Sequence, residues 1–295
     1  MKKIGHLLFS SASYLFAILP DFILFGIADI IYFITYYIIA YRKRVVFRNL
    51  KNSFPEKSDI ELKQIAKKFY RQLGDTIIET VALFSMSKKR VLKKVEFEET
   101  DILQDLYKKN KSIIGVSAHL YNWELMLAIP KVIPHQVLGI YKPLNNAFFD
   151  GQINKMRSKF GATPVTMEES YKVILKNYKE QKLSFIGLIA DQRPQKAHIS
   201  YWTSLLNQEA PFYNGPEKIA KKLNAAVVFL YLKRRKRGRY TIKFKLLFED
   251  VSKCKDHEIT EKYVQILEKT IQENPAYWLW SHKRWKHKAE SRLIN

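Results

Sequence analysis

Residues 113–125 read Ile113-Ile114-Gly115-Val116-Ser117-Ala118-His119-Leu120-Tyr121-Asn122-Trp123-Glu124-Leu125. The apolar run at its start predicts a buried strand, and the residues after it predict a helix with Asn122 as N-cap and Glu124 in the first turn. His119 therefore lies at a strand-to-helix junction. In open α/β sheets the carboxyl ends of the strands, where such junctions lie, are the usual place for a functional site.

The chain after residue 110 alternates between short apolar runs and segments with helical periodicity. Strands are expected at Ser112–Ser117, Gln136–Tyr141, Leu183–Ala190, Ala225–Leu232 and Tyr240–Phe248, and helices at Phe148–Phe160, Ser170–Glu180, Gly215–Leu223 and Ile259–Glu273. Residues 45–95 read as helical, with Ser58 able to cap a helix. This alternation predicts an α/β fold with a mainly parallel sheet flanked by helices.

The N-terminal segment is almost continuously apolar from Ile4 to Tyr41, interrupted by Pro20, Asp21 and Asp29. A membrane anchor is the leading interpretation. Phe22–Tyr41 is long enough to cross once, although Asp29 argues against a clean span, and a pair of buried core helices is the alternative. The basic residues after Tyr41 place the following domain on the cytoplasmic side. We therefore expect an anchor over residues 1–44 and a second domain over residues 45–295.

Charge and cysteine content narrow the possible partners. The formal net charge is +23, which favours anionic partners such as phosphate-bearing lipids, nucleic acid or an acidic protein. Cys254 is the only cysteine, so that no intrachain disulfide can form, and a packed side chain is its simplest role. His282 and His287 have no nearby carboxylate or cysteine, and no glycine-rich nucleotide loop occurs, so we expect neither a metal site nor a cofactor.

The pair His119 and Glu124 fits acyl transfer to an alcohol. Such a reaction needs a base for the hydroxyl proton, and histidine is the usual choice. Glu124 would orient the imidazole, as a carboxylate does in a catalytic triad. A capped helix beside a core histidine is the structural alternative.

At these residues the sequence resembles the bacterial late acyltransferases of lipid A biosynthesis, the lauroyl and myristoyl transferases, which share His-x4-acid chemistry with glycerolipid acyltransferases. Further blocks agree in order: Tyr141-Lys142-Pro143-Leu144-Asn145-Asn146, Arg157 with Gly161, Asp191-Gln192, Gly215, and Trp280-Ser281-His282-Lys283-Arg284-Trp285-Lys286. The resemblance covers essentially the whole chain and implies a glycerolipid acyltransferase-like fold after membrane-associated N-terminal helices.

The resemblance also implies further substrate-binding residues. Arg157 would bind the donor phosphate or the oxyanion, or else belong to a solvated helix face. Asp191 and Gln192 would position the acceptor sugar or the loop around His119, with a turn or capping aspartate as the alternative. Lys142 would contact an acceptor phosphate or be an ordinary surface lysine. Asn122 would act mainly through capping.

Two departures from the family's pattern concern the substrate. Lys142 stands where the family usually has arginine, which keeps the charge but loses the bidentate fork. Pro211-Phe212-Tyr213-Asn214 replaces a threonine cluster. The basic runs 233–239 and 283–288 fit lipid headgroups or an acidic carrier protein, although a charged hairpin tip accounts for the first.

The sequence thus predicts an acyltransferase that moves a fatty acyl chain from acyl carrier protein to a hydroxyl of a lipid A precursor. It would act at the inner membrane with its active site facing the cytoplasm. One alternative is the same chemistry on a glycerophospholipid or an aminoacyl lipid. The other is a noncatalytic basic protein that binds membrane or nucleic acid. Nucleic acid is not expected as a partner, because the basic and aromatic residues are scattered along the chain.

Overall fold

The computed structural model describes residues 2–288 as an α/β fold built on one large, mainly parallel sheet. Its strands are β1 (Val95–Glu98), β2 (Ile113–Ser117), β3 (Gln136–Tyr141), β4 (Thr163–Thr166), β5 (Ser184–Ile189), β8 (Ala226–Lys236) and β9 (Arg239–Phe248). They lie in the order β1-β9-β8-β2-β5-β3-β4. Only the β8–β9 hairpin is antiparallel among these neighbours. The predicted fold class is therefore confirmed for the sheet.

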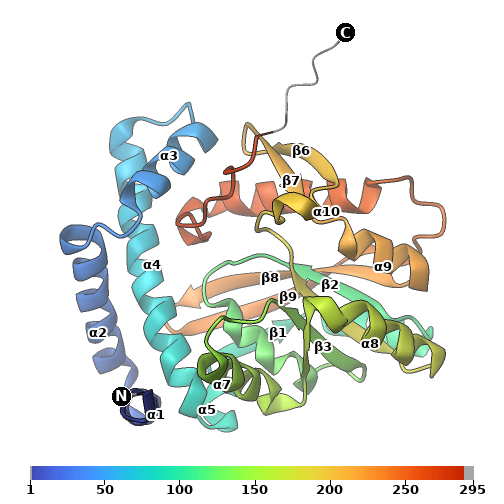
Figure 1. The fold of residues 1–295 in the computed structure, drawn as a ribbon, viewed down its shortest axis with the longest axis horizontal. Coiled ribbons are helices and arrows are strands. Elements are labelled where there is room, and N and C mark those ends of the chain that lie inside the picture. The colour runs from blue at the N-terminus through green and yellow to red at the C-terminus, as the bar shows by residue number, and fades with distance from the viewer. Residues whose placement is uncertain (1, 289–295) are drawn as a thin grey trace.

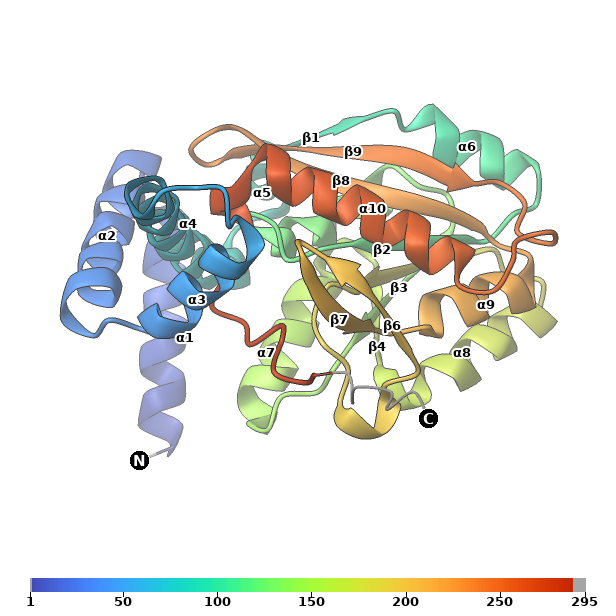
Figure 2. The ribbon, with the colours of Figure 1, turned by 90° about the horizontal axis from the view of Figure 1, so that it is seen from above.

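Helices flank this sheet. They are α1 (Lys2–Ile18), α2 (Asp21–Phe33), α3 (Lys43–Ser53), α4 (Asp59–Ser85), α5 (Lys88–Leu92), α6 (Asp101–Lys108), α7 (Ala147–Arg157), α8 (Met167–Lys179), α9 (Gly215–Leu223) and α10 (Glu258–Glu273). The other helical segments are the π-helix η1 (Ile34–Ile38) and the 3-10 helices η2 (Trp123–Lys131), η3 (Ser158–Phe160), η4 (Lys196–His198) and η5 (Pro275–Tyr277). In Figures 1 and 2, α2 and α4 stand side by side at one end of the sheet, and α9 and α10 lie above it in Figure 1.

Local sequence accounts for the long helix α4 and for the centre of the sheet. Ser58 caps α4 by accepting a hydrogen bond from the Glu61 N–H, and the Glu61 carboxylate accepts one from the Ser58 N–H at 2.8 Å. In β2, a Cβ on Gly115 would lie 2.2 Å from the ring of Phe185, so that the glycine makes room for this aromatic side chain. All five residues of β2 are buried, as a strand covered on both faces requires.

Helix α2 packs closely on α4. A Cβ on Gly74 of α4 would lie 2.5 Å from the carbonyl oxygen of Ala28 in α2. Both helices also bind the tip of the β8–β9 hairpin, because Arg237 donates to Asp29 of α2 at 2.8 Å and to Asp75 of α4 at 2.6 Å. The basic run 233–239 therefore forms a hairpin tip, as the alternative interpretation predicted, and Arg237 faces carboxylates of the protein.

The other side of α1 and α2 is apolar and exposed. Phe22 is 77% exposed and Ile30 59%, and the same holds for Leu7, Leu8, Tyr14, Leu15, Ile18, Phe33 and Tyr37. By length and composition the segment Asp21–Ile38 is able to cross a membrane, and 22% of it is buried in the protein. The N-terminal helices are thus present as expected, and the apolar side chains on their outer face are largely exposed.

Several elements were not expected. Strands β1 and β4 have four residues each, and β6 (Tyr201–Leu205) pairs with β7 (Gln208–Phe212) in a separate two-stranded sheet. Residues 123–131, expected as an α-helix, form the 3-10 helix η2, which includes Pro130. Because proline lacks an N–H and clashes with the preceding turn, a regular α-helix is disfavoured there.

Candidate active site

His119 and Asp191 lie side by side because they follow neighbouring parallel strands. His119 comes two residues after β2 and Asp191 two residues after β5, and these strands are paired along their whole length. The Ala190 N–H donates to the Ser117 carbonyl at 3.1 Å, which extends the pairing to the edge of the sheet. The carboxyl ends of both strands thus bring a histidine and an aspartate to one place, as the doubly wound fold predicts.

Two hydrogen bonds join His119 to Asp191. The imidazole Nδ1 lies 2.7 Å from Asp191 Oδ1, and the His119 backbone N–H donates to Oδ2 at 3.1 Å. The Trp278 indole donates to the same Oδ2 at 2.7 Å. Burial alone would raise the pKa of Asp191, but the charge of His119 and these hydrogen bonds outweigh it, so that the pKa is lowered. Asp191 is therefore an ionised acceptor that favours a proton on Nδ1.

This pairing differs from the expected one. We expected Glu124 to orient His119, but the Glu124 carboxylate is bound to Arg157, with Nε at 3.0 Å and Nη2 at 2.6 Å. The Trp123 indole also donates to Glu124 at 3.2 Å, and its ring meets that of His119 edge-on with centroids 4.8 Å apart. Trp123 therefore links two pairs, His119 with Asp191 and Glu124 with Arg157.

The chain between the two pairs is held in a left-handed conformation. Tyr121 has φ of 50°, which is unfavourable for a bulky residue. Its N–H donates to the Tyr277 carbonyl at 3.0 Å, its carbonyl accepts from the Thr76 hydroxyl at 3.0 Å, and its ring stacks on that of Tyr277. Strain of this kind persists where the surroundings over-determine it, and it is common at functional sites.

Asn122 precedes η2 but does not cap it. No side-chain hydrogen bond joins Asn122 to the first turn, and its amide instead donates to the Glu79 carboxylate of α4 at 3.3 Å. Tyr240 donates to the same carboxylate at 2.6 Å. Burial raises the pKa of Glu79 to about 7. The expected capping role is therefore wrong: the amide nitrogen is bound to Glu79, and Oδ1, the atom that would accept from the first turn, is buried without a partner in the described chain.

Gln192 and Lys142 lie differently with respect to His119. The Gln192 side-chain nitrogen is 3.3 Å from His119 Nε2, the imidazole nitrogen that Asp191 leaves unbound. Lys142 directly follows β3 and is exposed, and within residues 2–288 no hydrogen bond or ion pair joins its ammonium group to the protein. Gln192 thus lies directly beside His119, whereas Lys142 lies at the surface, as an ordinary surface lysine would.

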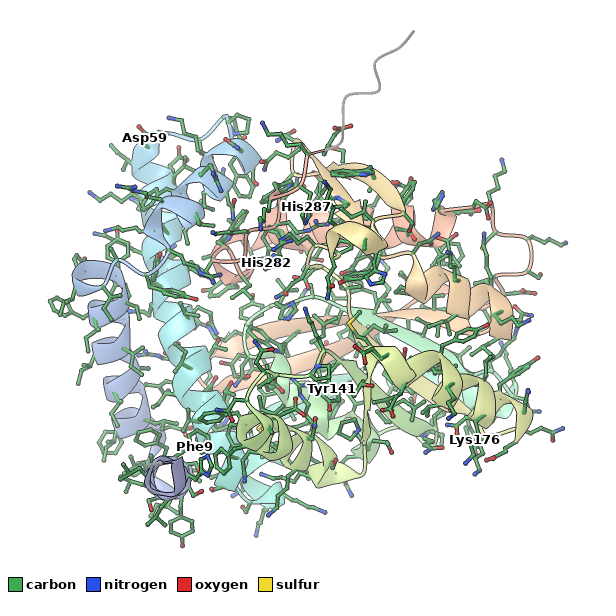
Figure 3. All side chains as sticks on the ribbon, in the orientation of Figure 1. Phe9, Asp59, Tyr141, Lys176, His282 and His287 are labelled. Carbon is green, nitrogen blue, oxygen red and sulfur yellow. The ribbon has the colours of Figure 1, made fainter. Side chains whose placement is uncertain are left out.

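A buried layer behind Asp191 was not expected as part of the site. Trp278, Trp280 and Arg284 are at most 2% exposed, so these tryptophans lie in the core and not at a surface. Burial lowers the pKa of His282 to about 4, which makes it neutral at physiological pH. Figure 3 shows His282 on the segment that leads from η5 toward the C-terminus. The Trp280–Lys286 block is the sequence signal for this layer.

No group of three or more His, Cys, Asp and Glu side chains that could hold a metal ion occurs in the described residues.

The chain matches a known family over nearly its whole length. The profile described as "Bacterial lipid A biosynthesis acyltransferase" matches residues 4–287. The chain belongs to this family. It is therefore an acyltransferase, as the resemblance of its motifs predicted. It is also similar to the "Lipid A biosynthesis lauroyltransferase" of Escherichia coli (strain K12), with 23% identity over 256 residues, 84% of this chain and 80% of that protein. The family match covers His119, Glu124, Arg157 and Asp191, the residues of both pairs.

Proposed function

We propose that this acyltransferase moves a fatty acyl chain from acyl carrier protein to a hydroxyl of a lipid A precursor, with His119 as general base. The observation that carries the proposal is the 2.7 Å contact between His119 Nδ1 and the Asp191 carboxylate, which favours the tautomer with its proton on Nδ1 and a lone pair on Nε2. The neighbouring Gln192 amide donates toward Nε2, which is consistent with a lone pair on that nitrogen. An acceptor hydroxyl that replaces the amide there would meet a base.

The reaction follows from this tautomer. His119 Nε2 takes the hydroxyl proton while the acceptor oxygen attacks the thioester carbonyl carbon. The tetrahedral intermediate collapses, the carbon–sulfur bond breaks, and the thiolate takes the proton from the imidazolium. Asp191 stabilises the imidazolium in between and acts as a positioning residue. No enzyme nucleophile is needed.

Arg157 is the proposed donor to the oxyanion of the intermediate. Its Nε and Nη2 are bound to Glu124, so that Nη1 remains for a substrate oxygen within the described set of contacts. Burial opposes a charge on Arg157, but the hydrogen bonds and charge of Glu124 outweigh it and raise its pKa. Glu124 thus acts through Arg157 in this scheme. A fixed cation near the developing charge is the arrangement that stabilises such intermediates.

Two features support action at a membrane that bears anionic lipids. The first is the exposed apolar face of α1 and α2, which includes Phe22 and Ile30. The second is a cavity of about 410 Å³ beside Asp21, lined mainly by the cations Lys89, Arg90, Lys93, Lys94 and Arg239. Apolar residues next to cations are typical of a surface that lies in the headgroup region of a bilayer. We place this face in the inner membrane and the site on its cytoplasmic side.

Two sequence features bear on the identity of the acceptor lipid. Lys142 and the segment 211–214 depart from the family pattern, which favours a test on several lipids. The experiment is transfer of labelled acyl chains from acyl carrier protein to lipid A precursors, a glycerophospholipid and an aminoacyl lipid, with His119→Ala as the variant. Transfer to a lipid A precursor that vanishes in His119→Ala is the expected result. Undiminished transfer by His119→Ala would contradict the base, and transfer to another lipid alone would contradict the acceptor.

A further inference from the structure

We propose that a cationic pocket, whose wall is linked to His119 through Arg193 and Gln192, binds the phosphate monoester of a phosphorylated sugar on the acceptor lipid; this inference rests on the proposed function. The pocket has a volume of about 540 Å³ and lies between α3, the β6–β7 hairpin and the C-terminal segment. In both views this segment runs between α3 and the hairpin. The residues that carry the argument are Arg48, Glu209, Lys283, Trp285, His287 and Lys288.

No carboxylate of the described residues pairs with the lysine and arginine side chains of this pocket. Within residues 2–288, no salt bridge or hydrogen bond engages the side chains of Arg48, Lys283 or Lys288, whereas Arg237 of the hairpin tip binds Asp29 and Asp75. Among the described lining residues, Glu209 is the one acid. Three cations facing one carboxylate leave a net positive charge, and a phosphate monoester carries about −1.5 to −2 at neutral pH. The charges are therefore complementary.

The pocket connects to the active site through consecutive residues. His287 on its wall accepts a hydrogen bond at Nε2 from Arg193 Nη1 at 2.8 Å. Arg193 directly follows Gln192, whose amide lies 3.3 Å from His119 Nε2. The pocket wall and the surroundings of His119 are thus joined through two adjacent residues, Gln192 and Arg193.

The wall of the pocket is fixed before any ligand binds. The Asn49 amide donates to the carbonyls of Trp280 at 2.9 Å and His282 at 3.0 Å. Arg42 donates to the Ser281 carbonyl at 3.1 Å. These bonds tie α3 and the residue before it to the C-terminal segment that carries Lys283 and His287. Figure 3 shows His282 and His287 on this segment. A preformed wall reduces the entropy that a ligand would lose on binding.

The remaining lining favours a sugar phosphate over the phosphodiester of an acyl carrier. Asn52 and Gln208 hydrogen-bond to each other at 3.2 Å on the pocket wall, and with Glu209 they offer partners for sugar hydroxyls. Trp285 supplies an indole, and its Nε1–H is buried without a partner in the described chain. A volume of this size is typical of small-molecule sites. Cations, hydroxyl partners and an indole together fit a charged sugar.

The first test measures binding of glucosamine 1-phosphate to the purified full-length protein by calorimetry. We expect binding that weakens at least tenfold in Arg48→Glu/Lys283→Glu, since both side chains are exposed and their replacement leaves the core intact. Lys176→Glu is the matched control, because Lys176 is an exposed lysine on α8, at the lower right of Figure 3. Affinity unchanged in the double variant, or lowered equally in the control, would overturn the proposal.

The second test separates acceptor from donor. With a phosphorylated acceptor, Lys283→Ala is expected to raise the acceptor KM several-fold and to leave kcat and the donor KM unchanged. With the same acceptor lacking its phosphate, wild type and Lys283→Ala are expected to behave alike. A rise in the donor KM would overturn the assignment to the acceptor. Binding of the sugar phosphate without any acyl transfer by the wild type would contradict the proposed function and leave the pocket supported.

Discussion

The Asp191 carboxylate accepts two hydrogen bonds from His119, one from the imidazole Nδ1–H and one from the backbone N–H. The carboxylate therefore fixes both the ring and the main chain at the end of β2. An asparagine in its place would present an N–H to Nδ1 in one of its orientations and move the imidazole proton to Nε2, where it blocks the base.

Asp191→Asn is therefore expected to lower kcat by about 10²- to 10⁴-fold with little change in KM. Steady-state transfer assays measure both constants. Asp105→Asn, at an exposed position on α6, is the control and should retain activity. Full activity in Asp191→Asn would mean that the imidazole does not need this partner.

The Glu124–Arg157 pair allows a measurement of coupling. Glu124 is 10% exposed and Arg157 29%, so that either single replacement leaves a largely desolvated charge. We expect Arg157→Ala to cost about 3 kcal/mol of unfolding free energy and the double variant Glu124→Ala/Arg157→Ala to cost less than the sum of both singles. Urea unfolding in a fixed detergent gives these values. Strict additivity would show that the pair is not coupled.

The elements around this site were predictable where the sequence pattern is local. The runs that became β2, β3 and β5 and the helix α9 follow from hydrophobic periodicity, and Ser58 with Glu61 marks the start of α4. Strands β1 and β4 have only four residues, and β4 contains Pro164, which is tolerated because β4 lies at the edge of the sheet. Such short segments carry too little periodicity to be recognised.

The partner of His119 was not predictable from spacing. Glu124 lies in the helix predicted after one strand, and Asp191 directly follows another predicted strand. Which of these two carboxylates reaches the imidazole depends on the order of the strands in the sheet. Only the pairing of β2 with β5 brings Asp191 to the imidazole, and only the position of α7 brings Arg157 to Glu124. The left-handed Tyr121 then depends on contacts with Thr76 and Tyr277, which are remote in sequence. These are tertiary relationships that no local pattern encodes.

Glu79 makes stability depend on pH near neutrality. Burial raises its pKa in the folded protein from 4.5 to about 7, although Lys94 and Tyr240 favour the ionised form. The Glu79 carboxyl group therefore binds its proton more tightly in the folded protein than in the unfolded chain. Its contribution is fully present below pH 4.5 and is lost as the pH rises through about 7.

We expect Glu79→Gln to reduce the fall in unfolding free energy between pH 5 and pH 8, a fall of about 3 kcal/mol at most. Thermal or urea unfolding at several pH values measures it. Glu180→Gln, at an exposed position, serves as the control and should keep the wild-type slope. An identical slope in Glu79→Gln would show that another group titrates.

Two exposed isoleucines, one on the apolar face of α2 and one on α4, form a matched pair for a membrane test. Ile30 on α2 is 59% exposed and Ile60 on α4 is 72% exposed, so that asparagine at either site disturbs little packing. Burying one isoleucine in the apolar part of a bilayer contributes about 1.5–3 kcal/mol. Ile30→Asn should therefore weaken partitioning into vesicles with anionic phospholipid by about tenfold or more. Ile60→Asn, near the start of α4, should leave it unchanged.

Flotation at limiting lipid concentration measures this partitioning directly. The ion pairs of Asp29 and Arg237 fix which side of α2 faces the protein, so that the effect should depend on the face that is changed. If both variants lose binding equally, the surface in contact with lipid extends beyond α1 and α2. If neither does, the face around Ile30 is not the membrane-contacting surface, and the apolar segment needs another partner.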